Sequence, residues 1–136
     1  MKKILSIFTL AFLLSISASA QHQVKRSFLV PDTPQQLELT YTNHVPLNGK
    51  NGSLYIKNQS DKDLKNVHII VSVKISWTDT VGSYPQKRTK KLILCDDQFD
   101  IAAYETNTLK ESNRGIIKGG PEKKGKTYSY DIEVTF

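Results

Sequence analysis

The segment Val67–Trp77, V-H-I-I-V-S-V-K-I-S-W, decides the fold of this chain. Its apolar side chains share one parity and its polar ones share the other, with Ile70 alone breaking the alternation. Because successive side chains of a strand point to opposite faces, this period of two predicts a β-strand with one buried face. Its many β-branched residues favour the same structure. Burying the aliphatic side chains of that face would contribute about 8–15 kcal/mol before conformational entropy is subtracted.

The length of this strand is itself informative. At about 3.3 Å per residue, Val67–Trp77 spans roughly 36 Å, longer than most strands. We therefore expect a bend or a β-bulge, or an end that projects past its partners. Trp77 then either caps the core, like the central-strand Trp of an immunoglobulin domain, or lies exposed at the tip and marks a binding end. We favour the first alternative.

Residues 1–20, MKKILSIFTLAFLLSISASA, have the pattern of a secretory signal peptide. Two lysines precede the apolar run Ile4–Ile16, and Ala-Ser-Ala follows it, which predicts cleavage after Ala20 and a secreted or periplasmic protein. The alternative, a transmembrane anchor, needs about 20 apolar residues, more than this run contains. The residue after Ala20 is Gln21, whereas a lipid anchor would need a cysteine there.

The remainder of the chain is the size of one domain. We expect a polar tail over 21–36, in which Ser27–Val30 is a candidate edge strand, and a single domain over 37–136. The formal net charge is +6, part of which belongs to the signal peptide. A charge of this size helps solubility and does not by itself imply nucleic acid, so we expect no nucleic-acid partner and no transmembrane span in the mature chain. The sequence leaves the oligomeric state open.

Further strands are expected from alternation and β-propensity, separated by turns. The segment Thr78–Gln86, with Gly82 and Pro85, is expected to be a connection too long for a tight hairpin. We therefore expect the next strand to pair with another neighbour or in a second sheet. Asp96–Asp100 is expected to be an acidic turn. The other predicted strands are Leu37–Tyr41, Ser53–Asn58, Lys87–Cys95, a short one near Thr106–Glu111, a short one within Arg114–Pro121, and Thr127–Phe136.

About seven strands without a convincing helix predict an all-β fold, an immunoglobulin-like antiparallel β-sandwich. Packing the Val67 face against the Tyr128 face would protect both from water. A small barrel is the alternative. The run Asn51–Ile75 resembles the front half of small immunoglobulin-like modules of bacterial envelope proteins, including the FxLYD-type domains. The naming motif of that family is absent, since Ile56 follows Leu54-Tyr55, and the resemblance implies a fold and an extracytoplasmic setting without an activity.

Chemistry-bearing motifs are scarce in this sequence. The histidines have no metal-ligand spacing, and two acidic runs match no known calcium loop. There is no nucleophile motif and no phosphate-binding glycine loop, so we expect no enzyme, no cofactor, no metal and no catalytic residues. Cys95 is alone, which excludes an internal disulfide, and it continues an apolar run. We favour a buried, inert thiol over an exposed one that pairs with another molecule.

Two basic segments remain as candidates for binding. In Lys87–Lys91, alternation places Lys87 and Lys91 on one face, with Arg88 and Lys90 on the other. The simpler interpretation of this segment is an edge strand protected from aggregation by charge. The loop Lys118–Lys126 either solubilises the protein or touches an anionic polymer or a lipid head group. The candidate binding residues are Trp77, Tyr84, Lys87, Arg88, Lys90 and Lys91.

Three classes of function fit these observations. The first is a non-enzymatic binding or accessory module of the bacterial envelope, with a protein or an envelope polymer as its partner. The second is a small secreted inhibitor or effector that presents sandwich loops such as Asn43–Gly52 and Thr78–Gln86. The third is a hydrolase whose site is assembled from distant strands and leaves no mark in the sequence. We favour the first.

Overall fold

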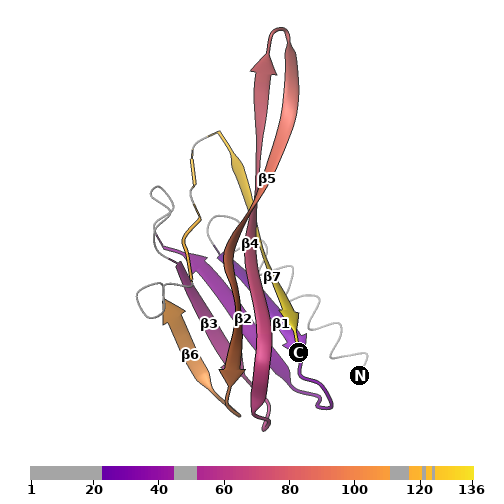
Figure 1. Cartoon of the computed structure of the whole chain (residues 1–136), viewed down its shortest axis with the longest axis vertical. Coiled ribbons are helices and arrows are strands. Elements are labelled where there is room, and N and C mark those ends of the chain that lie inside the picture. Colours follow the sequence, from indigo (N-terminus) through magenta and orange to yellow (C-terminus); the bar gives the residue numbers. More distant parts are fainter. Residues whose placement is uncertain (1–22, 45–51, 111–116, 121, 124) are drawn as a thin grey trace.

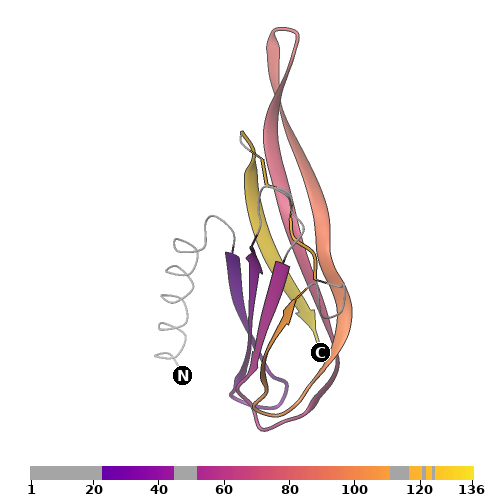
Figure 2. The ribbon, with the colours of Figure 1, turned by 90° about the vertical axis from the view of Figure 1, so that its left-hand side faces the viewer.

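Two antiparallel sheets packed face to face make up the folded domain (Figures 1 and 2). The computed structural model describes residues 23–44, 52–110, 117–120, 122, 123 and 125–136, so the predicted signal peptide lies outside the described residues. The strands of the described part are β1 (Gln23–Leu29), β2 (Gln36–Asn43), β3 (Gly52–Asn58), β4 (Leu64–Val81), β5 (Tyr84–Ile101), β6 (Thr106–Lys110) and β7 (Thr127–Thr135). No helix in these ranges is long and apolar enough to cross a membrane.

The strand order confirms the predicted sandwich. One sheet has the order β1-β2-β3-β6 and the other has the order β5-β4-β7, seven strands in the described chain. The consecutive strands β3 and β4 lie in different sheets, and each pairs with one of the consecutive strands β6 and β7. In constant-type immunoglobulin domains the second strand pairs with the fifth, whereas here β2 pairs with β3 in a meander.

The core forms where the expected face of β4 meets the four-stranded sheet. Val67, Ile69, Val71, Val73 and Ile75 are all buried, as the alternation predicts. They face alternate side chains of β2 and β3, of which Leu37, Leu39, Tyr41 and Leu54 are fully buried. Tyr130 and Ile132 of β7 complete this interior. The face-to-face packing removes both apolar faces from water, which is what stabilises a sandwich of this size.

β4 has both irregularities that its length led us to expect. It runs for 18 residues, and its register against β5 shifts between Val71 and Ser72, which leaves Leu94 of β5 without a partner. This is a β-bulge, and it turns the Leu94 side chain into the core. At the other end β4 outruns β7, whose pairing stops at Ser76. Beyond that point β4 and β5 continue alone as a two-stranded ribbon, Trp77–Arg88, which we call the arm (Figures 1 and 2).

The prediction of a long connection at Thr78–Gln86 is therefore wrong. These residues belong to a tight hairpin, because Val81 pairs with Tyr84 and only Gly82 and Ser83 form the loop. Gly82 has a φ of +66°, and it occupies the first loop position, where a type II′ turn requires glycine. The hairpin escaped sequence analysis because a ribbon exposed on both faces shows no alternation of apolar and polar side chains.

The expected acidic turn at Asp96–Asp100 is also wrong, since β5 continues to Ile101. Phe99 and Ile101 are buried beyond Cys95, and acidic or amide side chains alternate with them. Asp97 has the inward parity, yet it stays partly exposed because β5 is an edge strand. An inward-pointing charge on an edge strand discourages pairing with other chains.

The sheet begins earlier than we expected, within the segment assigned to a polar tail. β1 starts at Gln23 and pairs with β2 in a register that sets Val24 opposite Tyr41. Its sequence signal was weak because Val24 is the only buried side chain of the strand, while Lys25 and Arg26 give it a charged edge. The short strand near Thr106 and the C-terminal strand are confirmed. Of the strand expected within Arg114–Pro121, only 117–120 are described, and they do not form one.

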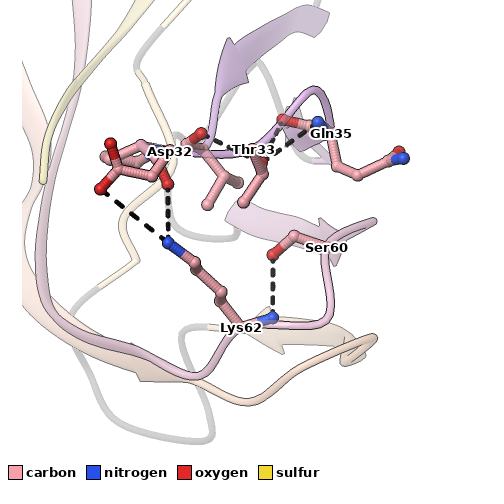
Figure 3. Close-up of polar contacts among 7 residues, drawn as sticks. Asp32, Thr33, Gln35, Ser60 and Lys62 are labelled. Atoms are coloured by element: carbon pink, nitrogen blue, oxygen red, sulfur yellow. Dashed lines mark hydrogen bonds and ion pairs between the residues drawn. The ribbon is translucent and has the colours of Figure 1, made fainter.

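The end of the sandwich opposite the arm is tied together by polar contacts (Figure 3). In the turn between β1 and β2, the Thr33 hydroxyl donates to the Val30 carbonyl at 3.0 Å and accepts from the Gln35 amide at 3.1 Å. Lys62, in the turn between β3 and β4, donates from Nζ to the Pro31 carbonyl at 3.2 Å and lies 4.0 Å from the Asp32 carboxylate. The two turns therefore hold each other in place.

Candidate binding arm and basic face

The six candidate binding residues all lie on the β4–β5 hairpin, and the register divides them between its two faces. Trp77 lies opposite Arg88, on the face that continues the core. Tyr84 lies at the tip beside the hairpin loop and is 76% exposed. Arg88 and Lys90 share the parity of Trp77, whereas Lys87 and Lys91 occupy the other face. This division is the one that alternation predicted.

A compact cluster fixes the base of the arm. Trp77 is partly buried and packs against the core, as we favoured. Its indole Nε1 donates to Asp79 Oδ1 at 3.1 Å, and Arg88 Nε lies 3.5 Å from Asp79 Oδ2. On the ring of Trp77, the Lys126 amine lies 4.4 Å from the centroid. These contacts give the indole nitrogen a hydrogen-bond partner and cover one face of its ring.

The opposite face carries lysines and hydroxyls in register across three strands. Two rows cross β5, β4 and β7 in that order, and they consist of Lys91, Lys74 and Ser129 and of Thr89, Ser76 and Thr127. A third row, on the arm itself, consists of Lys87 and Thr78. We call these eight residues the Lys/Thr face. It contains no acidic and no apolar side chain, and it continues from the sandwich onto the arm without a break.

Within the described part of the chain, the lysines of this face have no counter-ion. Lys74 and Lys91 are direct cross-strand partners, an arrangement of like charges that destabilises a sheet. No ion pair to Lys74, Lys87 or Lys91 is present within the described residues. On the outer face of the other sheet, by contrast, Lys25 pairs with Glu38 at 3.4 Å.

A groove of about 500 Å³ opens beside the row of Lys91 and Lys74. The residues that line it include Lys74, Lys90 and Lys91, together with Arg26 and Asp131. Arg26 reaches across the edge of the sandwich from β1, and its Nε donates to Asp131 Oδ1 at 3.2 Å. Asp131, the one carboxylate among the described lining residues, is thus already paired, and these residues carry net positive charge.

Other chemistry-bearing residues are held in structural roles. His68 pairs with Asp96 and His44 with Ser53, and these two sites are far apart in the fold. Within the described residues no group of three His, Cys, Asp or Glu side chains is placed to hold a metal ion. Cys95 is buried, as we favoured. Burial, with smaller contributions from Asp97 and Asp96, raises the pKa of its thiol to about 12, so the thiol is protonated at neutral pH.

A buried polar cluster closes the sandwich on the side of the 117–120 segment. Asn43 donates from Nδ2 to the Gly120 carbonyl at 2.6 Å and contacts the Tyr130 hydroxyl at 3.2 Å. Tyr130 in turn donates to the Glu122 carboxylate. Burial, followed by this hydrogen bond, raises the pKa of Tyr130. Next to this cluster, the Tyr41 hydroxyl donates to the Lys118 carbonyl at 2.6 Å, so the segment bridges the two sheets.

The position of Lys74 opposite Lys91, the contact of Lys126 with Trp77 and the partners of Asn43 were not predicted from the sequence. The parity of Lys74 was visible in the alternation of its strand, but its position opposite Lys91 depends on a register that no local signal encodes. Of the basic loop Lys118–Lys126, the described part places Lys126 on Trp77 and leaves Lys118 exposed. No protein-family model matches the chain, and no curated protein matches it significantly. The proposed function below is therefore based on the surface of the protein alone.

Proposed function

We propose that this protein is a secreted or periplasmic, non-enzymatic binding module that engages a surface or envelope component through the arm and the Lys/Thr face. The observation that carries the proposal is the projection of the arm. Its strands continue five residue pairs beyond the last pairing of β7, roughly 17 Å at about 3.3 Å per residue. The exposed Tyr84 lies at its tip and unpaired lysines lie along its base.

The energetics of the arm support a role outside the fold. A two-stranded hairpin without a third strand or a covered face is marginally stable in water. Here the Trp77 cluster holds one face of the arm, and the sheet just below the arm carries Lys74 opposite Lys91, which destabilises that pairing. Chain segments that contribute little to the core and carry unneutralised charge commonly serve binding. The signal-peptide pattern and the likeness to envelope modules favour an extracytoplasmic setting for this activity.

Retention of a cell-envelope component on the immobilised mature protein tests the proposal. The informative variant replaces Thr78–Lys87 by Asn-Gly, which closes the hairpin directly between Trp77 and Arg88 with a two-residue loop. We expect the wild type to retain a component that this arm-less variant retains at least tenfold less. Equal retention by the two proteins would overturn the proposal. Mass spectrometry of the exported protein should find Gln21 at its N-terminus, and an uncleaved chain would contradict the proposed setting.

A further inference from the structure

The geometry of the Lys/Thr face points to one class of partner, and we propose that this face binds an acidic polysaccharide; this inference rests on the proposed function. Along β5, Lys87 and Lys91 are four residues apart, about 13 Å at 3.3 Å per residue, with Thr89 between them. Lys74 and Thr78 lie beside them on β4. An extended polymer lying along the hairpin therefore meets charge, hydroxyl and charge in turn.

The chemistry of the face fits a chain of charged sugars. Threonine and serine hydroxyls both donate and accept hydrogen bonds, as sugar hydroxyls do. Lysine offers a hydrated point charge with three donors, which suits a carboxylate or sulfate that is spaced along a hydroxyl-rich chain. The adjoining groove, about 500 Å³, is comparable with pockets that hold small ligands, and Lys90 is among its lining residues. It therefore offers a recess for one or two charged sugar units.

Two other polyanions fit the face less well. Single-stranded nucleic acids stack their bases on aromatic side chains, but the Lys/Thr face has none, because Trp77 lies on the opposite face under Lys126. Tyr84 also has the parity of that opposite face. Amphipathic membrane-surface elements add apolar side chains that insert below the head groups, and the rows of the face contain none.

The outer face of the four-stranded sheet shows that hydroxyl side chains alone do not indicate a binding surface. It also carries threonines, including Thr40 and Thr108, because threonine is a good strand former. There, however, Lys25 is neutralised by Glu38 at 3.4 Å. What distinguishes the Lys/Thr face is that Lys74 and Lys91 are direct cross-strand neighbours and that, among the residues the structure describes, none of its lysines has a carboxylate partner. We accordingly place the polysaccharide on this face of the domain.

Titration calorimetry of the mature protein with polygalacturonate, heparin and neutral dextran at low ionic strength tests the proposal. We expect binding to one or both acidic polymers and none to dextran; polygalacturonate and heparin separate carboxylate from sulfate recognition. Substituting Lys74, Lys87 and Lys91 together by serine should weaken binding at least tenfold. The matched variant K57S/K65S/K123S removes the same charge elsewhere and should stay within twofold of the wild type. Equal loss in both triple variants would overturn the proposal.

A second variant separates sugar recognition from charge alone. T78V/T89V keeps two good strand formers and removes two hydroxyls, and it should weaken polygalacturonate binding at least threefold. Unchanged affinity in T78V/T89V, or tighter binding of oligo(dT) or phosphatidylglycerol vesicles than of either polysaccharide, would also overturn the proposal. If neither acidic polymer binds while envelope retention still depends on the arm, the polysaccharide inference fails and the proposed function stands. If neither acidic polymer binds and envelope retention does not depend on the arm, both the polysaccharide inference and the proposed function fail.

Discussion

The amine of Lys126 lies 4.4 Å from the centroid of the Trp77 ring, at the point where the arm leaves the sandwich. Lys126 immediately precedes β7, and Trp77 is the first residue of β4 beyond the reach of β7. The contact thus links the start of the last strand to the base of the hairpin. A cation over an aromatic ring contributes about 0.5–1 kcal/mol at an exposed site and about 2 kcal/mol when desolvated.

We predict that Lys126→Ala lowers the free energy of unfolding by about 1 kcal/mol, because it uncovers the partly buried indole and removes the cation. Trp77 is the only tryptophan of the chain, so its fluorescence reports on this contact directly. Urea unfolding followed by that emission measures the loss, and the folded variant should emit at longer wavelength. The control is Lys123→Ala, which removes an exposed lysine close in sequence. An equal effect in both variants would show that the loss does not come from the ring contact.

The arm-less variant, in which Asn-Gly replaces Thr78–Lys87, should keep a folded sandwich. The described side chains that it removes are exposed or only partly buried, and none belongs to the buried core. It also removes Asp79, the partner of Trp77 and Arg88, which should cost about 1 kcal/mol. Calorimetry should therefore find one cooperative transition, a few degrees below that of the wild type. A broad or absent transition would mean that the arm is part of the cooperative fold.

The sequence predicts the sandwich far better than the arm, for a physical reason. Where one face of a strand is buried, as from Val67 to Ile75, burial forces alternation and the strand is visible in the sequence. The arm buries neither face completely, so Thr78–Gln86 shows turn residues and no period. The Lys74–Lys91 relationship was equally out of reach, because it depends on a cross-strand register that includes the bulge at Leu94.

Tyr130→Phe should lower the free energy of unfolding by about 1 kcal/mol, because it removes the hydroxyl that donates to Glu122 and accepts from Asn43, while Asn43 keeps its direct hydrogen bond to Glu122 at 3.1 Å. Urea unfolding measures the change. Tyr55→Phe is the matched control, since Tyr55 lies on the outer face of the four-stranded sheet. No hydroxyl partner for Tyr55 is found within the described residues. We expect less than 0.5 kcal/mol from this control, as for most surface substitutions. Equal losses would mean that the buried hydroxyl network does not stabilise the fold.

Cys95 should make stability fall at alkaline pH. Its thiol pKa is raised from an ordinary value of 9.0 to about 12 in the folded protein, chiefly by burial. The folded state therefore holds this proton where the unfolded state has released it. Its stabilising contribution is complete below pH 9 and is lost as the pH rises from 9 toward 12. A pH of 10.5 is about 1.5 units above the pKa of the thiol in the unfolded chain. At that pH the free energy of unfolding should be lower by up to about 2 kcal/mol.

The pH dependence of Cys95→Ala isolates this contribution, because the variant differs from the wild type in this one titratable group. Between pH 8 and 10.5 the wild type should lose up to about 2 kcal/mol more than the variant, measured by urea unfolding in the presence of a reductant. A thiol reagent at pH 8 should modify the native wild type only at the rate at which the protein opens, because the thiolate is the reactive form and the side chain is buried. Parallel pH profiles together with rapid labelling would show that the thiol reaches solvent in the folded protein, and would place Cys95 among the residues available to a partner.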